Sequence, residues 1–370
     1  MHVVQVLVSL NLGGSELVAV ELAEFAAAAG HRVTVIAADG PLGDRVRASG
    51  AEHLAWPIGK KRLATLRYIS RLHGWLQTER PDVLHVHSRL PAWICHFAMR
   101  RLPAGARPAY ITSVHGHYSV SRYSAVMAGG DRVIAVSDHI RDYTLHNYPN
   151  TETDRVTTVH GGISRQAFPF GYQPSPGWRE DACREFPELR GRRWICLPGR
   201  LSRYKGHAEF IELVALLEPR VPDIHGVIVG QARPGSRYRD ELEGLAERYG
   251  VLDRITFTQA RMDMRDWMAA SEIVYSLCAD PPEAFGRTVP EALHLGVPVL
   301  GWDHGGVQET LAAMFPQGAV APGDRAALLE RSLQFLRQRP EVAPGTAFGL
   351  HESMEKTMAV YQSVLGESAS

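Results

Sequence analysis

The order of local patterns along the chain constrains its fold most strongly. Short runs of apolar, β-branched residues alternate with longer segments in which apolar residues recur at helical spacing. The clearest of these segments are residues 16–29 and 69–79. Such alternation is typical of parallel sheets covered by helices on both faces, so we expect an α/β fold. The predicted strands are 2–9, 31–37, 83–87, 109–114, 132–136, 155–159, 194–197, 225–229, 254–257, 273–277 and 298–301.

The alternation pauses once, at residues 164–180, which are rich in Pro, Gly and aromatic side chains. This composition predicts a linker between two Rossmann-like, doubly wound domains, residues 1–170 and 171–345, followed by a terminal segment 346–370. Ligands of such sheets bind at the carboxyl ends of the strands, so we expect the site in a cleft between the domains.

Charge and composition exclude several classes of protein. The 40 basic and 40 acidic residues balance, whereas a protein built to bind nucleic acid would be clearly basic. Residues 1–170 hold 18 basic and 13 acidic side chains, so this half is positive. No apolar run is long enough for a membrane span, and the N-terminus lacks the pattern of a signal peptide. We therefore expect a cytoplasmic protein.

Two glycine-containing loops follow predicted strands and precede predicted helices. Gly13 and Gly14 would let a ligand approach the backbone at a helix N-terminus, although a tight turn with Ser15 as the N-cap explains them equally well. In the loop L-P-G-R-L-S-R-Y-K-G, Arg200 and Lys205 would converge on a diphosphate, unless the loop is simply a solvated basic one.

A third loop, E-A-F-G-R-T-V-P-E-A-L, begins at Glu283. Gly286 permits close backbone approach, and N–H groups at the following helix start can bind phosphate oxygens. Glu283 is expected in the loop and Glu291 on the helix, where they face different parts of one elongated ligand. The alternative is an acidic first turn that complements the helix dipole. The downstream runs G-V-P-V-L and G-G-V-Q-E favour the ligand site.

These motifs together resemble glycosyltransferase family 4, from the first strand to about Gly323. The resemblance implies the GT-B fold and a retaining, metal-independent transfer from a nucleotide diphosphate sugar, with a UDP-sugar favoured. It implies an acceptor-binding N-terminal domain, a donor-binding C-terminal domain and a helix at 351–364 that packs back on the first domain. The run from Gly286 to Gly306 looks most like bacterial enzymes that build lipopolysaccharide or other surface glycans. The acceptor would therefore be a glycan or glycolipid, and no cofactor or metal is expected.

The resemblance also implies roles for individual residues. Glu283 would contact hydroxyls of the donor sugar, Glu291 the ribose hydroxyls, and Arg200 with Lys205 the diphosphate. Catalytic roles would fall to His115, Glu283, Arg200 and Lys205. The donor-binding residues would be Gly13, Gly14, Gly230, Met262, Phe285, Gly286, Arg287 and Glu291.

Two H-x-H pairs, His85/His87 and His115/His117, end predicted strands. Such pairs also bind metal in hydrolases, which makes a metal-dependent hydrolase one alternative. The resemblance instead places His115 near the donor sugar. No carboxylate ligand motif accompanies His85 and His87, so packing or acceptor contacts are favoured for them. The role of His117 stays open, and a nucleotide-sugar epimerase of the same fold is a further alternative.

Two other segments carry smaller predictions. Ser137 or Asp138 is expected to cap the helix that follows the strand 132–136. Residues 60–76 form a basic helical pattern whose apolar face holds Leu63, Leu66, Ile69, Leu72 and Leu76. This segment suits an anionic membrane surface on the inner face of the plasma membrane, an ordinary sheet-covering helix, or both.

Overall fold

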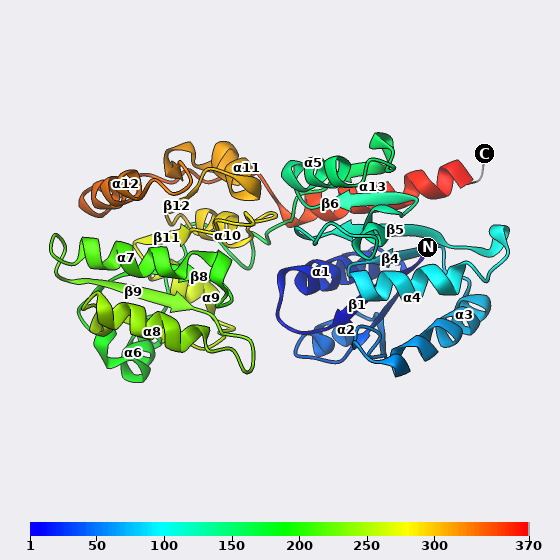
Figure 1. The fold of residues 1–370 in the computed structure, drawn as a ribbon, viewed down its shortest axis with the longest axis horizontal. Coiled ribbons are helices and arrows are strands. Elements are labelled where there is room, and N and C mark those ends of the chain that lie inside the picture. The colour runs from blue at the N-terminus through cyan, green and yellow to red at the C-terminus, as the bar shows by residue number, and fades with distance from the viewer. Residues whose placement is uncertain (369–370) are drawn as a thin grey trace. The chain divides into compact units, whose positions relative to one another are not determined.

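The computed structural model describes residues 1–368 and divides into two compact α/β units (Figure 1). Unit 1 comprises Met1–Gly162 and Leu350–Ser370, and unit 2 comprises Ile163–Gly349. The boundary expected after residue 170 falls inside unit 2, because the N–H of Ile163 already donates to the carbonyl of Phe348 in that unit. Residues 369–370 of the expected terminal segment lie outside the described residues.

Unit 1 is built on a seven-stranded parallel sheet in the order β3-β2-β1-β4-β5-β6-β7. Its strands are β1 (His2–Ser9), β2 (Arg32–Ala38), β3 (Glu52–Ala55), β4 (Val83–Val86), β5 (Ala109–Val114), β6 (Arg132–Ala135) and β7 (Val156–Thr158). All six strands predicted for this half are present. The edge strand β3 was not predicted, because its four residues are largely exposed or half-buried and carry no apolar run.

Helices cover both faces of this sheet: α1 (Gly14–Ala28), α2 (Gly43–Ala48), α3 (Arg67–Glu79), α4 (Arg89–Met99), α5 (Asp138–Asn147) and α13 (Leu350–Ser368). The helix α13 packs against α1, β5 and β6, and its Met354, Met358 and Tyr361 belong to the core of unit 1 (Figure 1). The N–H of Ile140 donates to Ser137 Oγ, so the predicted cap of α5 is confirmed.

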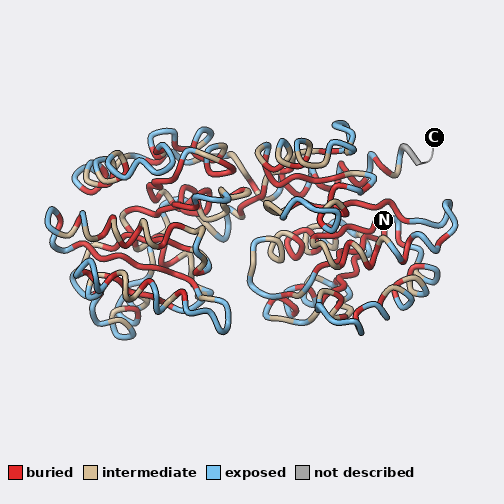
Figure 2. The backbone as a smooth tube through the Cα atoms, viewed as in Figure 1, coloured by how far each residue is buried: buried red, intermediate tan, exposed pale blue. Residues whose placement is uncertain are grey.

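Unit 2 is built on a six-stranded parallel sheet in the order β10-β9-β8-β11-β12-β13. Its strands are β8 (Arg193–Pro198), β9 (Ile224–Val229), β10 (Ile255–Thr258), β11 (Ile273–Ser276), β12 (Val299–Trp302) and β13 (Ala319–Val320). Its helices are α6 (Pro176–Glu185), α7 (His207–Leu217), α8 (Tyr238–Arg248), α9 (Met264–Ala269), α10 (Thr288–His294), α11 (Gly305–Met314) and α12 (Arg325–Arg337). Only the two-residue β13 was missed. Figure 2 shows the strands of each sheet buried beneath partly exposed helices.

Each sheet has a point where its winding reverses. In unit 1 the chain moves from β1 outward through β2 and β3, then returns to the other side of β1 with β4. In unit 2 it moves from β8 through β9 and β10, then returns with β11. Ligands of doubly wound sheets bind outside the carboxyl ends of the strands at such a switch point. The loops after β1, β4, β8 and β11 are therefore the places to search for function.

The basic segment 60–76 differs from its prediction. The α-helix begins only at Arg67, after a 3₁₀ turn at Leu63–Leu66, because Thr65 folds back and its hydroxyl donates to the carbonyl of Lys60. Leu72 is buried as predicted, but Leu63 is 88% and Leu66 54% exposed, so the single predicted apolar face is wrong. Within residues 1–368, no helix combines the length and the apolar character needed to cross a membrane.

Candidate active site

An ion pair lies at the switch point of unit 2. Lys205, in the loop after β8, donates from Nζ to Oε1 of Glu283, in the loop after β11. The two side chains are only 21% and 17% exposed. Burial alone would lower the pKa of Lys205, but attraction to Glu283 outweighs it and holds the pKa above its ordinary value. The site therefore contains a mostly buried lysine that stays protonated at neutral pH.

Glycines bring the surrounding loops into backbone contact. A Cβ at Gly206 would lie 2.2 Å from the carbonyl oxygen of Leu277, and the residue has φ 77°, which favours glycine. A Cβ at Gly230 would lie 1.9 Å from the carbonyl oxygen of Gly199. The loops that follow β8, β9 and β11 thus pack with no room for a side chain at these two positions.

The loop that carries Glu283 is fixed by the start of α11. The N–H of Gly306 donates to the carbonyl oxygen of Glu283 at 2.9 Å. A Cβ at Gly306 would lie 2.4 Å from the carbonyl oxygen of Ala284, so this position also needs glycine. This contact explains why the run G-G-V-Q-E accompanies the Glu283 motif. The Phe285 side chain is buried against Phe348, with ring centroids 5.5 Å apart.

The second glutamate lies on a helix, as predicted. Glu291 is on α10, and Nε of Arg287 donates to its Oε1 at 3.4 Å. Both side chains are largely buried, at 10% and 14% exposure. Gly286, between the two glutamates, has φ 77° and allows the chain to turn from the loop into α10. The motif therefore presents one carboxylate from a loop and one from a helix.

Two of the predicted donor-site residues are more exposed. The guanidinium Nη2 of Arg200 donates to the hydroxyl of Tyr204 at 3.0 Å, and Arg200 is otherwise exposed. Met262 is 77% exposed in the loop after β10. Because the Met262 side chain is so exposed, we expect this loop to contact a ligand through its backbone groups.

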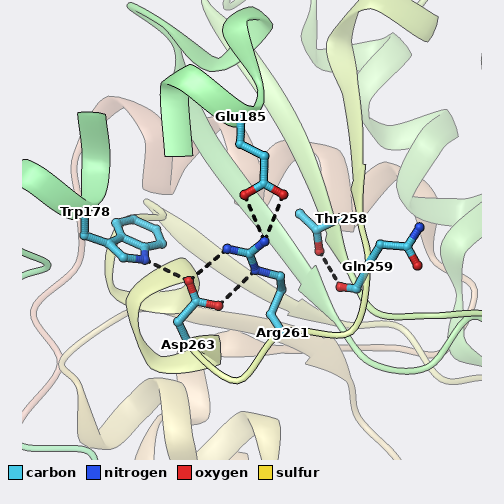
Figure 3. Close-up of polar contacts among 6 residues, drawn as sticks. All are labelled: Trp178, Glu185, Thr258, Gln259, Arg261 and Asp263. Atoms are coloured by element: carbon cyan, nitrogen blue, oxygen red, sulfur yellow. Dashed lines mark hydrogen bonds and ion pairs between the residues drawn. The ribbon is translucent and has the colours of Figure 1, made fainter. Parts of the chain in front are cut away.

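Polar contacts hold this loop after β10 in place (Figure 3). Arg261 donates from Nε to Oδ1 of Asp263 at 3.0 Å and from Nη1 to Glu185 at 3.0 Å. The indole N–H of Trp178 donates to the same aspartate at 2.8 Å. Desolvation acts to raise the pKa of Asp263, but the hydrogen bonds from Arg261 and Trp178 outweigh it, and the pKa lies below its ordinary value. The exposed Met262 therefore lies between Arg261 and Asp263, which these hydrogen bonds hold in place.

Unit 1 has a different arrangement at the ends of its strands. Nε2 of His115, after β5, lies 2.9 Å from Nδ1 of His87, after β4. Nε2 of His87 lies 2.5 Å from Oε1 of Gln5 on β1. The amide Nε2 of Gln5 donates to the hydroxyl of Tyr361 on α13 at 3.0 Å. His85 completes the network, with Nδ1 2.6 Å from that hydroxyl and Nε2 2.7 Å from the hydroxyl of Ser113.

The histidines of this network are neutral. Burial lowers the pKa of His115 to about 4 and that of His85 to about 3, and it holds the pKa of His87 well below its ordinary value. Both ring nitrogens of His85 and of His87 have hydrogen-bond partners. Neither of these two rings keeps a lone pair for a metal, so the geometry does not fit a metal site on the His85/His87 pair. Nε2 of His117 lies 2.7 Å from Nε2 of His139.

The first glycine pair lies at the switch point of unit 1, between β1 and α1. Gly13 is the N-cap of α1 and Gly14 its first residue, so the alternative with Ser15 as the N-cap is wrong. Ser15 instead donates to Oε2 of Glu16 at 2.8 Å. A Cβ at Gly14 would meet nothing within 4 Å, so the space beside this exposed helix start is open.

Sequence reasoning missed Gln5 and Tyr361. Gln5 gave a signal, since it is a polar residue inside the apolar run H-V-V-Q-V-L-V, and such a buried amide needs partners. Tyr361 gave none, because its partner lies 356 positions away.

Residues 12–167 match Glycosyltransferase Family 4, and residues 180–344 match Glycosyl transferases group 1. The lipopolysaccharide core biosynthesis mannosyltransferase LpsB of Rhizobium meliloti is 25% identical over 313 residues, which span 82% of this chain and 83% of LpsB. A glycosyltransferase from Rickettsia africae (TM-score 0.82, 21% identity, 98% of both chains) has the same fold. Anabaena Alr3699/HepE, solved with UDP and glucose, also shares it (TM-score 0.82, 20% identity, 98% of this chain and 100% of HepE). The chain thus belongs to glycosyltransferase family 4 and is a glycosyltransferase of the GT-B fold.

Proposed function

We propose that the enzyme transfers a sugar from a nucleotide diphosphate sugar, with a UDP-sugar favoured, to a hydroxyl of a glycan or glycolipid. The observation that carries this proposal is the Lys205–Glu283 pair at the switch point of unit 2. The family supports it, as does the binding of UDP in the HepE structure. The name of LpsB supports a place in lipopolysaccharide or other cell-surface glycan synthesis.

Charge is the first requirement of this reaction. Cleavage of the sugar–phosphate bond leaves negative charge on the departing diphosphate, and a fixed cation stabilises that charge as it develops. Lys205 is protonated and held in place, and Arg200 would add a planar fork for phosphate oxygens. These two cations take the place that a metal holds in other transferases, so the proposed reaction needs no metal.

The two glutamates would bind the ends of the donor. Glu283, with one oxygen engaged by Lys205, would accept hydrogen bonds from donor-sugar hydroxyls through the other. Glu291 would accept from the ribose hydroxyls. Retention would follow if the acceptor attacks the face that the diphosphate leaves, with a diphosphate oxygen taking the acceptor proton.

A thermal-shift series with UDP, GDP, ADP and CMP, with and without chelator, tests the donor site. A ligand bound only by the native state raises its stability. We expect selective stabilisation by one nucleoside diphosphate, unchanged by chelator. Product analysis with the matching nucleotide sugar should then show a glycosylated acceptor. An epimerised nucleotide sugar without transfer would favour the epimerase alternative, and no response to any nucleotide would contradict the proposal.

We also propose that the enzyme associates peripherally with anionic membranes on the cytoplasmic side. The basic patch consists of Lys60, Lys61, Arg62, Leu63, Leu66 and Arg67, all exposed. Cations around two exposed leucines suit anionic lipid headgroups with shallow apolar insertion.

Co-sedimentation with vesicles tests the basic patch. The enzyme should bind vesicles rich in phosphatidylglycerol and not pure phosphatidylcholine vesicles. The double variant Leu63→Ser, Leu66→Ser should bind several-fold less, since each buried CH₂ contributes about 0.8 kcal/mol. The control is Leu216→Ser, which alters a 43% exposed leucine in unit 2. Equal binding by both variants would contradict the membrane role.

A further inference from the structure

The network in unit 1 is a continuous line of hydrogen bonds. It runs from His115 through His87 and Gln5 to Tyr361, and then through His85 to Ser113. A neutral imidazole has one N–H and one lone pair, so each ring must donate at one nitrogen and accept at the other. The direction of the whole line is therefore fixed wherever one member has distinguishable donor and acceptor atoms.

Gln5 is that member. The structure places its carbonyl Oε1 at His87 and its amide Nε2 at Tyr361. Because Oε1 only accepts, Nε2 of His87 must carry the proton and Nδ1 of His87 must accept. Nε2 of His115 must then be the donor to that Nδ1. The proton of His115 is on Nε2, and its Nδ1 carries a lone pair.

The other half of the line agrees with this direction. Gln5 donates to the Tyr361 hydroxyl, so that hydroxyl gives its own hydrogen to Nδ1 of His85. Nε2 of His85 then donates to the hydroxyl of Ser113. Reversal would require the amide, both hydroxyls and all three rings to change together, and buried hydrogen bonds in series reinforce one another.

The free end of the line is at His115. This residue is partly exposed, and its Nδ1 has no hydrogen bond with any of residues 1–368. A neutral imidazole with a bare Nδ1 accepts from a hydroxyl and does not donate to a carbonyl or an ether oxygen. The tautomer therefore decides which groups this end can recognise.

We propose that Gln5 and Tyr361 are positioning residues that fix the tautomer of His115, so that its Nδ1 accepts a hydrogen bond from a hydroxyl of the sugar substrate. The substrate part of this inference rests on the proposed function, whereas the tautomer does not. It predicts that a sugar with a hydroxyl at the contacting position is used, and that its deoxy or O-methyl analogue is used less well. It also gives α13 a role in the site beyond packing.

The tautomer is measured without any substrate. Enzyme labelled with ¹⁵N-histidine is examined near neutral pH by long-range ¹H–¹⁵N correlation, and the signals of His115 are identified by their loss in His115→Gln. We expect a protonated Nε2 and an unprotonated Nδ1. A proton on Nδ1, or an average of both tautomers, would overturn the inference even if the enzyme transfers sugar.

Tyr361→Phe tests the role of α13. Gln5 then loses its acceptor and His85 its donor, so the His115 signals should move toward a mixture of tautomers. The value of kcat/KM should fall roughly two- to tenfold, the range for one lost neutral hydrogen bond. Tyr110→Phe is the matched control in the same unit, because that buried hydroxyl donates to the carbonyl of Ala92 outside the line. It should leave the His115 signals unchanged.

The outcomes separate the two proposals. An unchanged His115 tautomer in folded Tyr361→Phe would overturn the positioning role. If Tyr361→Phe does not fold, the wild-type spectrum alone still decides the tautomer. The expected tautomer together with an absence of transfer from any nucleotide sugar would remove the proposed function and leave the positioning role standing.

Discussion

The two switch points of this enzyme have the same topology and opposite chemistry. In unit 2, β8 and β11 end at a buried ion pair between Lys205 and Glu283. In unit 1, a neutral network joins His87, which follows β4, to Gln5 in the middle of β1. One fold thus supports a charged site in one unit and an uncharged, buried polar site in the other.

The difference fits the two kinds of group in the proposed donor, a nucleotide sugar. Phosphate oxygens carry charge and need cations or charge-assisted hydrogen bonds. Sugar hydroxyls are neutral and are recognised by oriented donors and acceptors, which a network of fixed polarity supplies. The predictions below test this contrast, beginning with the largest expected effect.

Lys205→Ala should affect catalysis most. If Lys205 stabilises the leaving diphosphate as proposed, its loss should lower kcat about 10²–10³-fold. Donor affinity should fall less, because the interaction strengthens as the bond breaks. Steady-state kinetics and direct binding measure the two quantities. Lys356→Ala, which changes an exposed lysine on α13, is the control. A loss of affinity with an unchanged kcat would indicate that Lys205 contributes to ground-state binding only.

Glu291→Gln should weaken donor binding without a comparable loss of kcat. A hydrogen bond to a charged acceptor contributes about 1.5–3 kcal/mol, which corresponds to roughly 10- to 150-fold in affinity. Titration calorimetry with UDP and with 2′,3′-dideoxy-UDP measures the effect. The wild type should prefer UDP, and the variant should lose that preference. An unchanged preference would exclude Glu291 as the ribose ligand.

Gly230→Ala should destabilise unit 2, since its Cβ would lie 1.9 Å from the backbone of Gly199. Such overpacking costs about 1–3 kcal/mol in the free energy of unfolding. Gly244→Ala in α8 is the opposite control. Its Cβ would meet only the end of Arg248 at 3.8 Å, so the variant should be stabilised by about 0.5–1 kcal/mol. Denaturant unfolding measures the stability of the two variants. Equal stability of Gly230→Ala and Gly244→Ala would contradict the close contact between Gly230 and the backbone of Gly199.

Acidification should destabilise unit 1 more than unit 2. Unit 1 contains three neutral network histidines, whereas in unit 2 burial lowers the pKa of two histidines, His207 and His225, to about 4. Below pH 6.5 the unfolded chain binds protons that the folded units do not, so stability is full above 6.5 and falls toward pH 4. The loss between pH 7 and 5.5 is about 1 kcal/mol for each histidine.

Hydrogen exchange, corrected for its intrinsic pH dependence, reports on the two units separately. His146→Gln, at an exposed position on α5, should leave this pH dependence unchanged. Equal protection of the amide hydrogens of unit 1 at pH 7 and pH 5.5 would mean that its histidines are already protonated in the folded state.

The sequence predicted the parts of the fold and site that depend on local pattern. Strands such as β1 and β9 are largely apolar because parallel strands are buried on both faces. The placement of Glu283 and Glu291 followed from a loop and a helix start that are contiguous in the chain. The partly exposed edge strand β3 and the start of α3 did not follow, because neither has an apolar period of its own.

Local sequence patterns did not predict the contacts between residues that are far apart in the chain. The glycine at 230 is required by the backbone of Gly199, which follows the neighbouring strand β8. The state of His115 depends on Gln5 and on Tyr361 at opposite ends of the sequence. Single-sequence patterns report what a segment buries and not which distant residue meets it.

The affinity of the enzyme for UDP compared with uridine, measured in chelator, tests the central claim most directly. A diphosphate site built from Lys205 predicts much tighter binding of UDP than of uridine. The double variant Lys205→Met, Glu283→Gln, which leaves no buried charge unpaired, should lose most of this preference and keep only the part that Arg200 supplies. An unchanged preference of this variant for UDP, or a preference that disappears in chelator in the wild type, would contradict the account.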